Sequence, residues 1–143
     1  MGQLNRNNGL GKEVLAFILV PAGHAGANKE LLHNLELPYQ AVTSTDLYLT
    51  HYLNDSANDP VMNRIRAQKL RNSEEDKVKI FFVPSYLNGD DGVLNMPYYD
   101  LLVGMDLTAF PSYYEPWGYT PLESLAFKVP TITTTLAGFG LWV

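Results

Sequence analysis

Two glutamates and a group of aromatic residues form the part of this sequence best suited to chemistry. Glu115 and Glu123 are separated by seven residues. The aromatic residues that crowd the same stretch are Tyr113, Tyr114, Trp117 and Tyr119. Carboxylates accept hydrogen bonds from hydroxyl groups, and aromatic rings offer flat apolar faces for stacking. A surface turn is normally small and polar, so this composition favours a binding loop.

A helix is predicted over residues 120–127, directly after this loop. Thr120 is a favourable N-cap, Pro121 suits the first helical position, and Glu123 completes a Thr-x-x-Glu capping box. The free N–H groups and the dipole of such a helix start attract phosphate. Gly118 lets a ligand approach the backbone closely. With the carboxylates and rings nearby, the stretch favours a nucleotide sugar as its ligand.

Each of these residues also has a purely structural interpretation. Glu123 can serve only as a capping residue, Glu115 only as a loop carboxylate, and the rings only as packing. The structural interpretation is sufficient for any one residue alone. It is less able to explain why four rings and two carboxylates occur together.

The elements that must position this loop follow from the apolar pattern. Continuous apolar runs predict buried strands at 14–20, 78–83, 106–110 and 131–133. Helices are predicted between them at 59–71, where Asp59 and Pro60 form the start, at 97–105 and at 120–127. This alternation indicates the α/β class, a Rossmann-like open parallel sheet with helices on both faces. Ligands of such sheets bind outside the carboxyl ends of the strands.

Length and composition set the remaining limits. The chain has 143 residues, no cysteine and a net charge of −5, which predicts one domain over 13–143 after a polar segment at 1–12. Lack of cysteine excludes disulfides and thiol chemistry and fits a reducing, cytoplasmic compartment. The acidic balance argues against nucleic acid as the main partner. No apolar stretch is long enough to span a bilayer.

Two other interpretations are disfavoured by the sequence. The apolar run at 14–20 follows two basic residues, as in a signal peptide, but Glu13 lies directly against it and Pro21 ends it. The three histidines lack the spacing of metal ligands and are expected at the surface; they are His24, His33 and His51. No metal site is therefore predicted.

The stretch Pro-Ser-Tyr-Tyr-Glu-Pro-Trp-Gly-Tyr-Thr-Pro at 111–121 resembles the donor-site signature of glycogen synthases of the animal and fungal type. The similarity continues through segments at 59–60, 77–80, 96–100, 130–134 and 137–140, and more loosely at 14–22. It covers about 130 residues and is strongest over roughly the last 85. It implies the GT-B architecture of two Rossmann-like domains, of which this chain would be most of the C-terminal, donor-binding one.

The resemblance also implies a role for each residue of the loop. Glu115 would hold hydroxyls of the donor glucose near the anomeric carbon, as the catalytic residue of this set. Glu123 would accept hydrogen bonds from the ribose hydroxyls. Gly118, Tyr119 and Thr120 would face the diphosphate, whose developing charge the helix start stabilises.

Two further aromatic residues belong to the implied donor site. Tyr98 falls at the position that stacks on the base, although a shift of one residue would give that role to Tyr99. Both tyrosines could instead pin a short helix to the sheet. Trp117 is assigned to donor binding as part of the aromatic loop.

The implied reaction is the retaining transfer of glucose from a nucleotide diphosphate glucose, in first place UDP-glucose, to the non-reducing end of an α-1,4-glucan. It implies no metal or other cofactor, since backbone dipoles and basic side chains meet the leaving diphosphate. The expected partners are the nucleotide sugar and the glucan acceptor, in a parent enzyme that can be a homo-oligomer. A basic Arg and Lys pair and the acceptor domain would lie outside residues 1–143, so the chain alone is expected to be inactive.

Two alternatives stay open at this point. Starch-synthase and sucrose-synthase relatives also place two glutamates seven residues apart around a glycine, although their loops are poorer in aromatic residues. A non-catalytic module that binds carbohydrate or nucleotide would keep the same residues. A dehydrogenase is disfavoured because no Gly-x-Gly-x-x-Gly follows any predicted strand.

Overall fold

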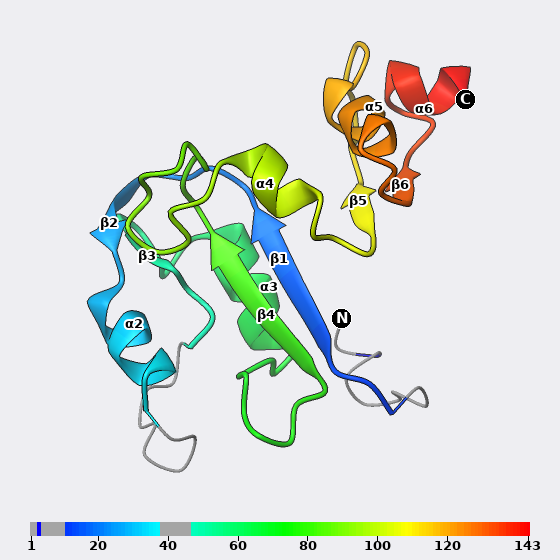
Figure 1. The fold of residues 1–143 in the computed structure, drawn as a ribbon. Coiled ribbons are helices and arrows are strands. Elements are labelled where there is room, and N and C mark those ends of the chain that lie inside the picture. The colour runs from blue at the N-terminus through cyan, green and yellow to red at the C-terminus, as the bar shows by residue number, and fades with distance from the viewer. Residues whose placement is uncertain (1–2, 4–10, 38–46) are drawn as a thin grey trace. The chain divides into compact units, whose positions relative to one another are not determined.

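The computed structural model describes residue 3 and residues 11–37 and 47–143 (Figure 1). The chain divides by its internal contacts into two units, Met1–Asn95 and Met96–Val143. The first unit contains β1 (Val14–Leu19), β2 (His24–Ala27), α2 (Lys29–Leu35), β3 (His51–Leu53), α3 (Pro60–Ala67) and β4 (Val78–Val83). The second contains α4 (Tyr98–Leu102), β5 (Thr108–Phe110), α5 (Tyr119–Ala126), β6 (Thr131–Thr133) and α6 (Gly138–Trp142). The mixed α/β class with parallel strands is confirmed.

Strand β4 is the centre of the first unit. It pairs in parallel with β1, from Val14 opposite Val78 to Leu19 opposite Val83, and the two arrows run side by side in Figure 1. On its other edge the Phe82 N–H donates to the Tyr48 carbonyl at 2.6 Å. Leu49 forms a parallel bridge with Phe82, so three parallel segments meet at β4. The strand buries the side chains at 78, 80, 82 and 83.

Helix α3 covers this parallel arrangement with its apolar side. The Asp59 carboxylate accepts from the Met62 N–H at 2.8 Å, which confirms the predicted helix start. Met62 and Ile65 are buried and pack in one cluster with Val78, Ile80 and Phe82 of β4. The helix ends at Ala67, four residues before the predicted end. Lys69 and Asn72 adopt left-handed backbone angles, φ 56° and 57°, which turn the chain toward β4.

Asn72 joins three segments of the first unit. Its Nδ2 donates to the carbonyl oxygens of Ile80 at 2.8 Å and Leu47 at 3.2 Å, and its Oδ1 accepts from the Ile80 N–H at 2.8 Å. The side chain is buried. Asparagine also tolerates the left-handed angle better than most residues. One side chain thus ties the turn after α3 to β4 and to the segment beside it.

The sequence predicts one open parallel sheet, whereas the described strands are divided among several small sheets. The described strands form three two-stranded sheets: β1 with β4 in parallel, β2 with β3 antiparallel, and β5 with β6 in parallel. Strands β2 and β3 and helices α2 and α6 are absent from the prediction. Residues 24–27 and 138–142 are rich in glycine and alanine and show no usable period, so pairing and packing decide their conformation. The single domain over 13–143 stays a prediction, and most of residues 1–12 lie outside the described residues.

The expectation of surface histidines is wrong for His51. Its side chain is completely buried. Its Nδ1 lies 2.8 Å from Thr50 Oγ1 and its Nε2 lies 2.8 Å from the Asp91 carbonyl oxygen. The His24 ring packs edge-on against it, with ring centroids 4.7 Å apart. Thr50 is the preceding residue, but Asp91 is 40 residues away and His24 is on another strand, so local sequence carries no sign of the contacts that enclose the ring.

Replacing Asn72 is expected to destabilise the fold. Asn72→Ala leaves the buried N–H and carbonyl of Ile80 without their partner and places alanine at a left-handed angle, which should lower the free energy of unfolding by about 2–3 kcal/mol. Urea unfolding of the chain, followed by far-ultraviolet circular dichroism, measures this. The control is Asn63→Ala on the exposed side of α3, expected to change stability by less than about 0.5 kcal/mol. Equal midpoints for the two variants would contradict the assigned role.

Candidate donor-binding site

The residues predicted for the donor site all lie in the second unit. Strands β5 and β6 pair in parallel, from Thr108 opposite Thr131 to Phe110 opposite Thr133. Thr108 Oγ1 lies 2.6 Å from Ser124 Oγ of α5 and 3.0 Å from Thr131 Oγ1, which fixes α5 to both strands. The loop 111–118 therefore leaves the carboxyl end of β5 and enters α5, at the edge where α/β folds bind ligands.

The start of α5 differs from the prediction. The helix begins at Tyr119, its N-cap is Gly118 with φ 93° and ψ 81°, and no side chain caps it. The predicted N-cap at Thr120 and the capping box with Glu123 are therefore wrong. The left-handed angle of Gly118 lets the chain enter the helix earlier than a threonine cap would, and Pro121 becomes the third helical residue. The N–H groups of Tyr119 and Thr120 stand at this open helix end.

Glu115 lies beside the entry to α5. Its Oε2 accepts from the Ser112 hydroxyl at 3.3 Å. A Cβ atom on Gly118 would lie 3.4 Å from the same carboxylate oxygen. The structure thus brings Glu115 and Gly118 together. The side chain is half-buried.

The first residues of α6 hold the Glu115 loop in place. The Glu115 carbonyl accepts from the Gly138 N–H at 3.1 Å, and the Trp117 carbonyl accepts from the Phe139 N–H at 2.6 Å. A Cβ atom on Gly138 would overlap the Pro116 carbonyl oxygen, so this contact requires glycine.

Trp117 is occupied by packing in this structure. Its ring centroid lies 5.9 Å from that of Phe139 and 6.0 Å from that of Trp142, in one aromatic cluster. The side chain is half-buried. Its predicted part in donor binding stays a prediction, and the structure places it where it fixes the loop against α6.

Glu123 and the two tyrosines of α4 form a second group. The Tyr99 hydroxyl donates to Glu123 Oε1 at 3.0 Å. The Tyr99 ring stacks on Phe127, with centroids 5.3 Å apart, and the Tyr98 ring lies 5.4 Å from Tyr99. Partial burial, followed by the charge of Glu123, raises the pKa of Tyr98. The hydrogen bond to Glu123, followed by its charge, raises the pKa of Tyr99, so both phenols are protonated at neutral pH.

Sequence reasoning missed the hydrogen bond between Tyr99 and Glu123. The two residues are 24 positions apart and belong to different helices. No periodicity connects them, and the capping-box pattern gave Glu123 a different partner. The remaining predicted residues, Tyr119 and Thr120, are exposed at the start of α5.

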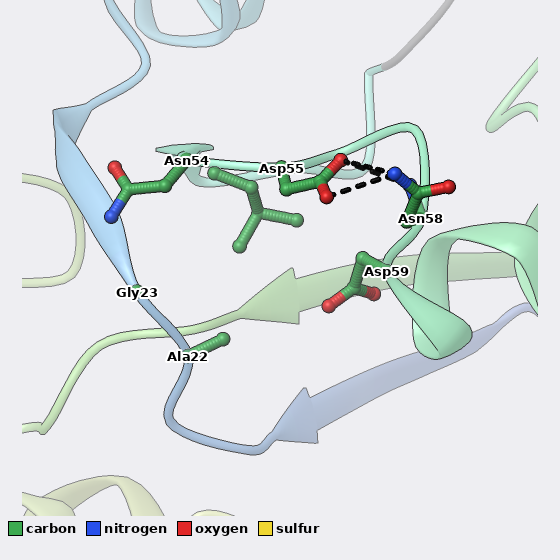
Figure 2. A pocket seen from close by; sticks show the side chains of 7 residues that line it. Ala22, Gly23, Asn54, Asp55, Asn58 and Asp59 are labelled. Atoms are coloured by element: carbon green, nitrogen blue, oxygen red, sulfur yellow. Dashed lines mark hydrogen bonds between the residues drawn. The ribbon is translucent and has the colours of Figure 1, made fainter.

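A separate pocket lies in the first unit (Figure 2). It has a volume of about 280 Å³ and is lined by Ala22, Gly23, Leu53, Asn54, Asp55, Asn58 and Asp59. Its carboxylates already serve the local turn, since Asp55 accepts from Asn58 Nδ2 at 2.9 Å and Asp59 caps α3. The pKa of Asp55 is lowered, mainly by the hydrogen bond from the Asn58 side chain. The pocket contains none of the predicted site residues.

The ranges that the structure describes contain neither a cluster of metal ligands nor a membrane-spanning helix. No group of three or more His, Cys, Asp or Glu side chains there could hold a metal ion. No helix in those ranges is both long and apolar enough to cross a bilayer.

The contact between Gly138 and Pro116 is expected to limit substitution sharply. Gly138→Ala forces the new methyl group into the Pro116 carbonyl. The substitution should lower the free energy of unfolding by about 1–3 kcal/mol and loosen the Glu115 loop. Amide hydrogen exchange at Gly138 and Phe139 should become faster, because their N–H bonds to the loop weaken.

Gly104→Ala is the matched control for this substitution. Its Cβ would lie no closer than 3.4 Å to the nearest atom, the Leu101 carbonyl oxygen. The control should leave exchange at residues 138 and 139 unchanged. Equal effects of the two alanines would contradict the close approach.

Comparison with known proteins identifies the family of this chain. A sequence model of the glycogen synthase family matches residues 27–143. The chain is 46% identical over 95 residues to "Glycogen [starch] synthase isoform 1" of Saccharomyces cerevisiae, and 43% identical over 94 residues to "Glycogen [starch] synthase, liver" of Mus musculus. These alignments cover 66% of this chain and 13% of each relative, so the chain spans a small part of their length. The loosely similar segment 14–22 lies outside the family match. The chain belongs to the glycogen synthase family.

Proposed function

We propose that this chain is the donor-binding part of a retaining glucosyltransferase, which moves glucose from UDP-glucose to the non-reducing end of an α-1,4-glucan. The observation that carries the proposal is the placement of two carboxylates around an uncapped helix start. Glu115 lies beside Gly118, and Glu123 lies in the second turn of the same helix. The printed names of the relatives, glycogen and starch synthases, support a glucan product.

The start of α5 suits the diphosphate of such a donor. The N–H groups of Tyr119 and Thr120 and the helix dipole favour an anion at this end. Gly118 has no side chain to hold the ligand away. When the glycosidic bond to the diphosphate breaks, negative charge grows on the leaving oxygen, and preorganised N–H dipoles stabilise it. The proposed chemistry therefore needs no metal or other cofactor at this position.

The two carboxylates bind opposite ends of the donor. Glu115 accepts hydrogen bonds from the glucose hydroxyls and orients the anomeric carbon, as a group that touches the reacting sugar. Glu123 accepts from the ribose hydroxyls, and Tyr98 stacks on the base. Trp117 supports the site through the aromatic cluster that holds the loop against α6.

The rest of the machinery belongs to a longer protein. The matched region makes up 13% of each of the two relatives, so most of their length lies outside it. We propose that the parent protein is cytoplasmic, because the nucleotide sugar and the glucan must both reach this site. The glucan acceptor then binds opposite the donor, on residues outside this chain.

The carboxylate of Glu115 is expected to be essential in the full-length protein. Glu115→Gln keeps the shape but removes the charge that orients the sugar, so turnover should fall by about 100-fold or more. The measurement is transfer of radiolabelled glucose from UDP-glucose to glycogen. Glu13→Gln, at an exposed position before β1, serves as the control and should keep full activity. Unchanged turnover in the Glu115 variant would refute its assignment.

The 143-residue chain by itself is expected to transfer no glucose and to bind UDP weakly. It offers a helix start, two carboxylates and a stacking ring, which together suit a Kd near 1 mM, or about −4 kcal/mol. Isothermal titration with UDP measures the affinity, and the glycogen-transfer assay measures activity. Glucose transfer by the isolated chain would show that the site is complete without the other domain.

A further inference from the structure

Tyr99 makes two contacts that fix its position on α4. Its hydroxyl donates to Glu123 Oε1 at 3.0 Å. Its ring stacks on Phe127, just after the end of α5, with centroids 5.3 Å apart and an angle of 26° between the planes. The ring thus packs at the C-terminal end of α5, while the hydroxyl binds Glu123 within the helix. Glu123 belongs to α5, whose start lies at the candidate donor site, and Phe127 directly follows that helix.

The two carboxylate oxygens of Glu123 differ in their hydrogen bonds. A phenol has a single proton, and that proton points to Oε1. Among the residues that the structure describes, no hydrogen bond to Oε2 is found, so this oxygen can accept from a ligand. The side chain is long and flexible, and a fixed Oε1 removes much of the ordering that a ligand would otherwise have to impose.

We propose that Tyr99 is a positioning residue for the donor ribose: it holds Glu123 by one carboxylate oxygen so that the other receives the ribose hydroxyls. The inference rests on the proposed function, because it assumes that a nucleotide binds at Glu123. It adds a residue that acts through Glu123 and does not touch the reacting sugar. The raised pKa of Tyr99 keeps the phenol a donor across the neutral range.

The same contacts separate the roles of the two neighbouring tyrosines. One face of the Tyr99 ring is taken by Phe127, and its hydroxyl is taken by Glu123. Tyr98 is half-buried and makes no such bond to Glu123 in the structure. Tyr99 is therefore committed to positioning, which leaves Tyr98 for stacking on the base.

The test compares two nucleotides on the full-length protein. Tyr99→Phe removes only the hydroxyl and keeps the stack on Phe127. Isothermal titration should show UDP binding about 5- to 10-fold weaker, as for loss of one solvent-exposed hydrogen bond. Binding of 2′,3′-dideoxy-UDP should be unchanged, because this probe has no ribose hydroxyls. The KM for UDP-glucose should rise by the same factor while kcat changes less than about twofold.

A control and a double-mutant cycle sharpen the result. Tyr52→Phe removes an equivalent hydroxyl on β3, 44% exposed and outside the site, and should change neither affinity. In a Glu123→Ala background, Tyr99→Phe should cause no further loss of UDP affinity, since its effect passes through Glu123.

Three results would overturn the inference: unchanged UDP affinity in Tyr99→Phe, an equal loss for both nucleotides, or an additive loss in the cycle. Each of these leaves the proposed function intact. Failure of the unaltered full-length protein to bind UDP would instead overturn the proposed function, and the inference with it.

Discussion

The backbone contact between Gly138 and Pro116 is the constraint on which the second unit depends. Because residue 138 has no side chain, its N–H reaches the Glu115 carbonyl at 3.1 Å, and the next N–H reaches Trp117. These two bonds tie the segment after β6 to the loop after β5. The position of Glu115, and the angle at which Gly118 enters α5, follow from that tie. Gly118, Gly138 and the two backbone hydrogen bonds thus fix the backbone on which the site residues stand.

Much of the fold is encoded in local sequence, and the parts that are not share one physical cause. The bounds of β4 and β6, and the start of α3 at Asp59, agree with the sequence because apolar runs and caps are local signals. The start of α5 does not agree, because two good signals compete there. A threonine cap and a left-handed glycine both suit a helix start, and only tertiary contacts decide between them.

The candidate site divides in the same way. Residue type and spacing single out Glu115 and Glu123, because carboxylates in an aromatic loop are unusual. The partners of those carboxylates are not predictable, because Ser112 is an ordinary loop residue and Tyr99 lies on another helix. His51 shows the same limit in the first unit, where a hydrogen bond to a residue 40 positions away and the His24 ring enclose a side chain expected at the surface.

The aromatic cluster beside the Glu115 loop has an optical consequence. The chain contains two tryptophans, Trp117 and Trp142, and their rings lie 6.0 Å apart in that cluster. Nearly all long-wavelength ultraviolet emission of the chain therefore originates where α6 packs on the loop. A change in tryptophan fluorescence reports the opening of this one contact, whereas far-ultraviolet signals average over both units. Any difference between the two signals during unfolding would show that the Glu115 loop loosens at a different point from the β1 and β4 core.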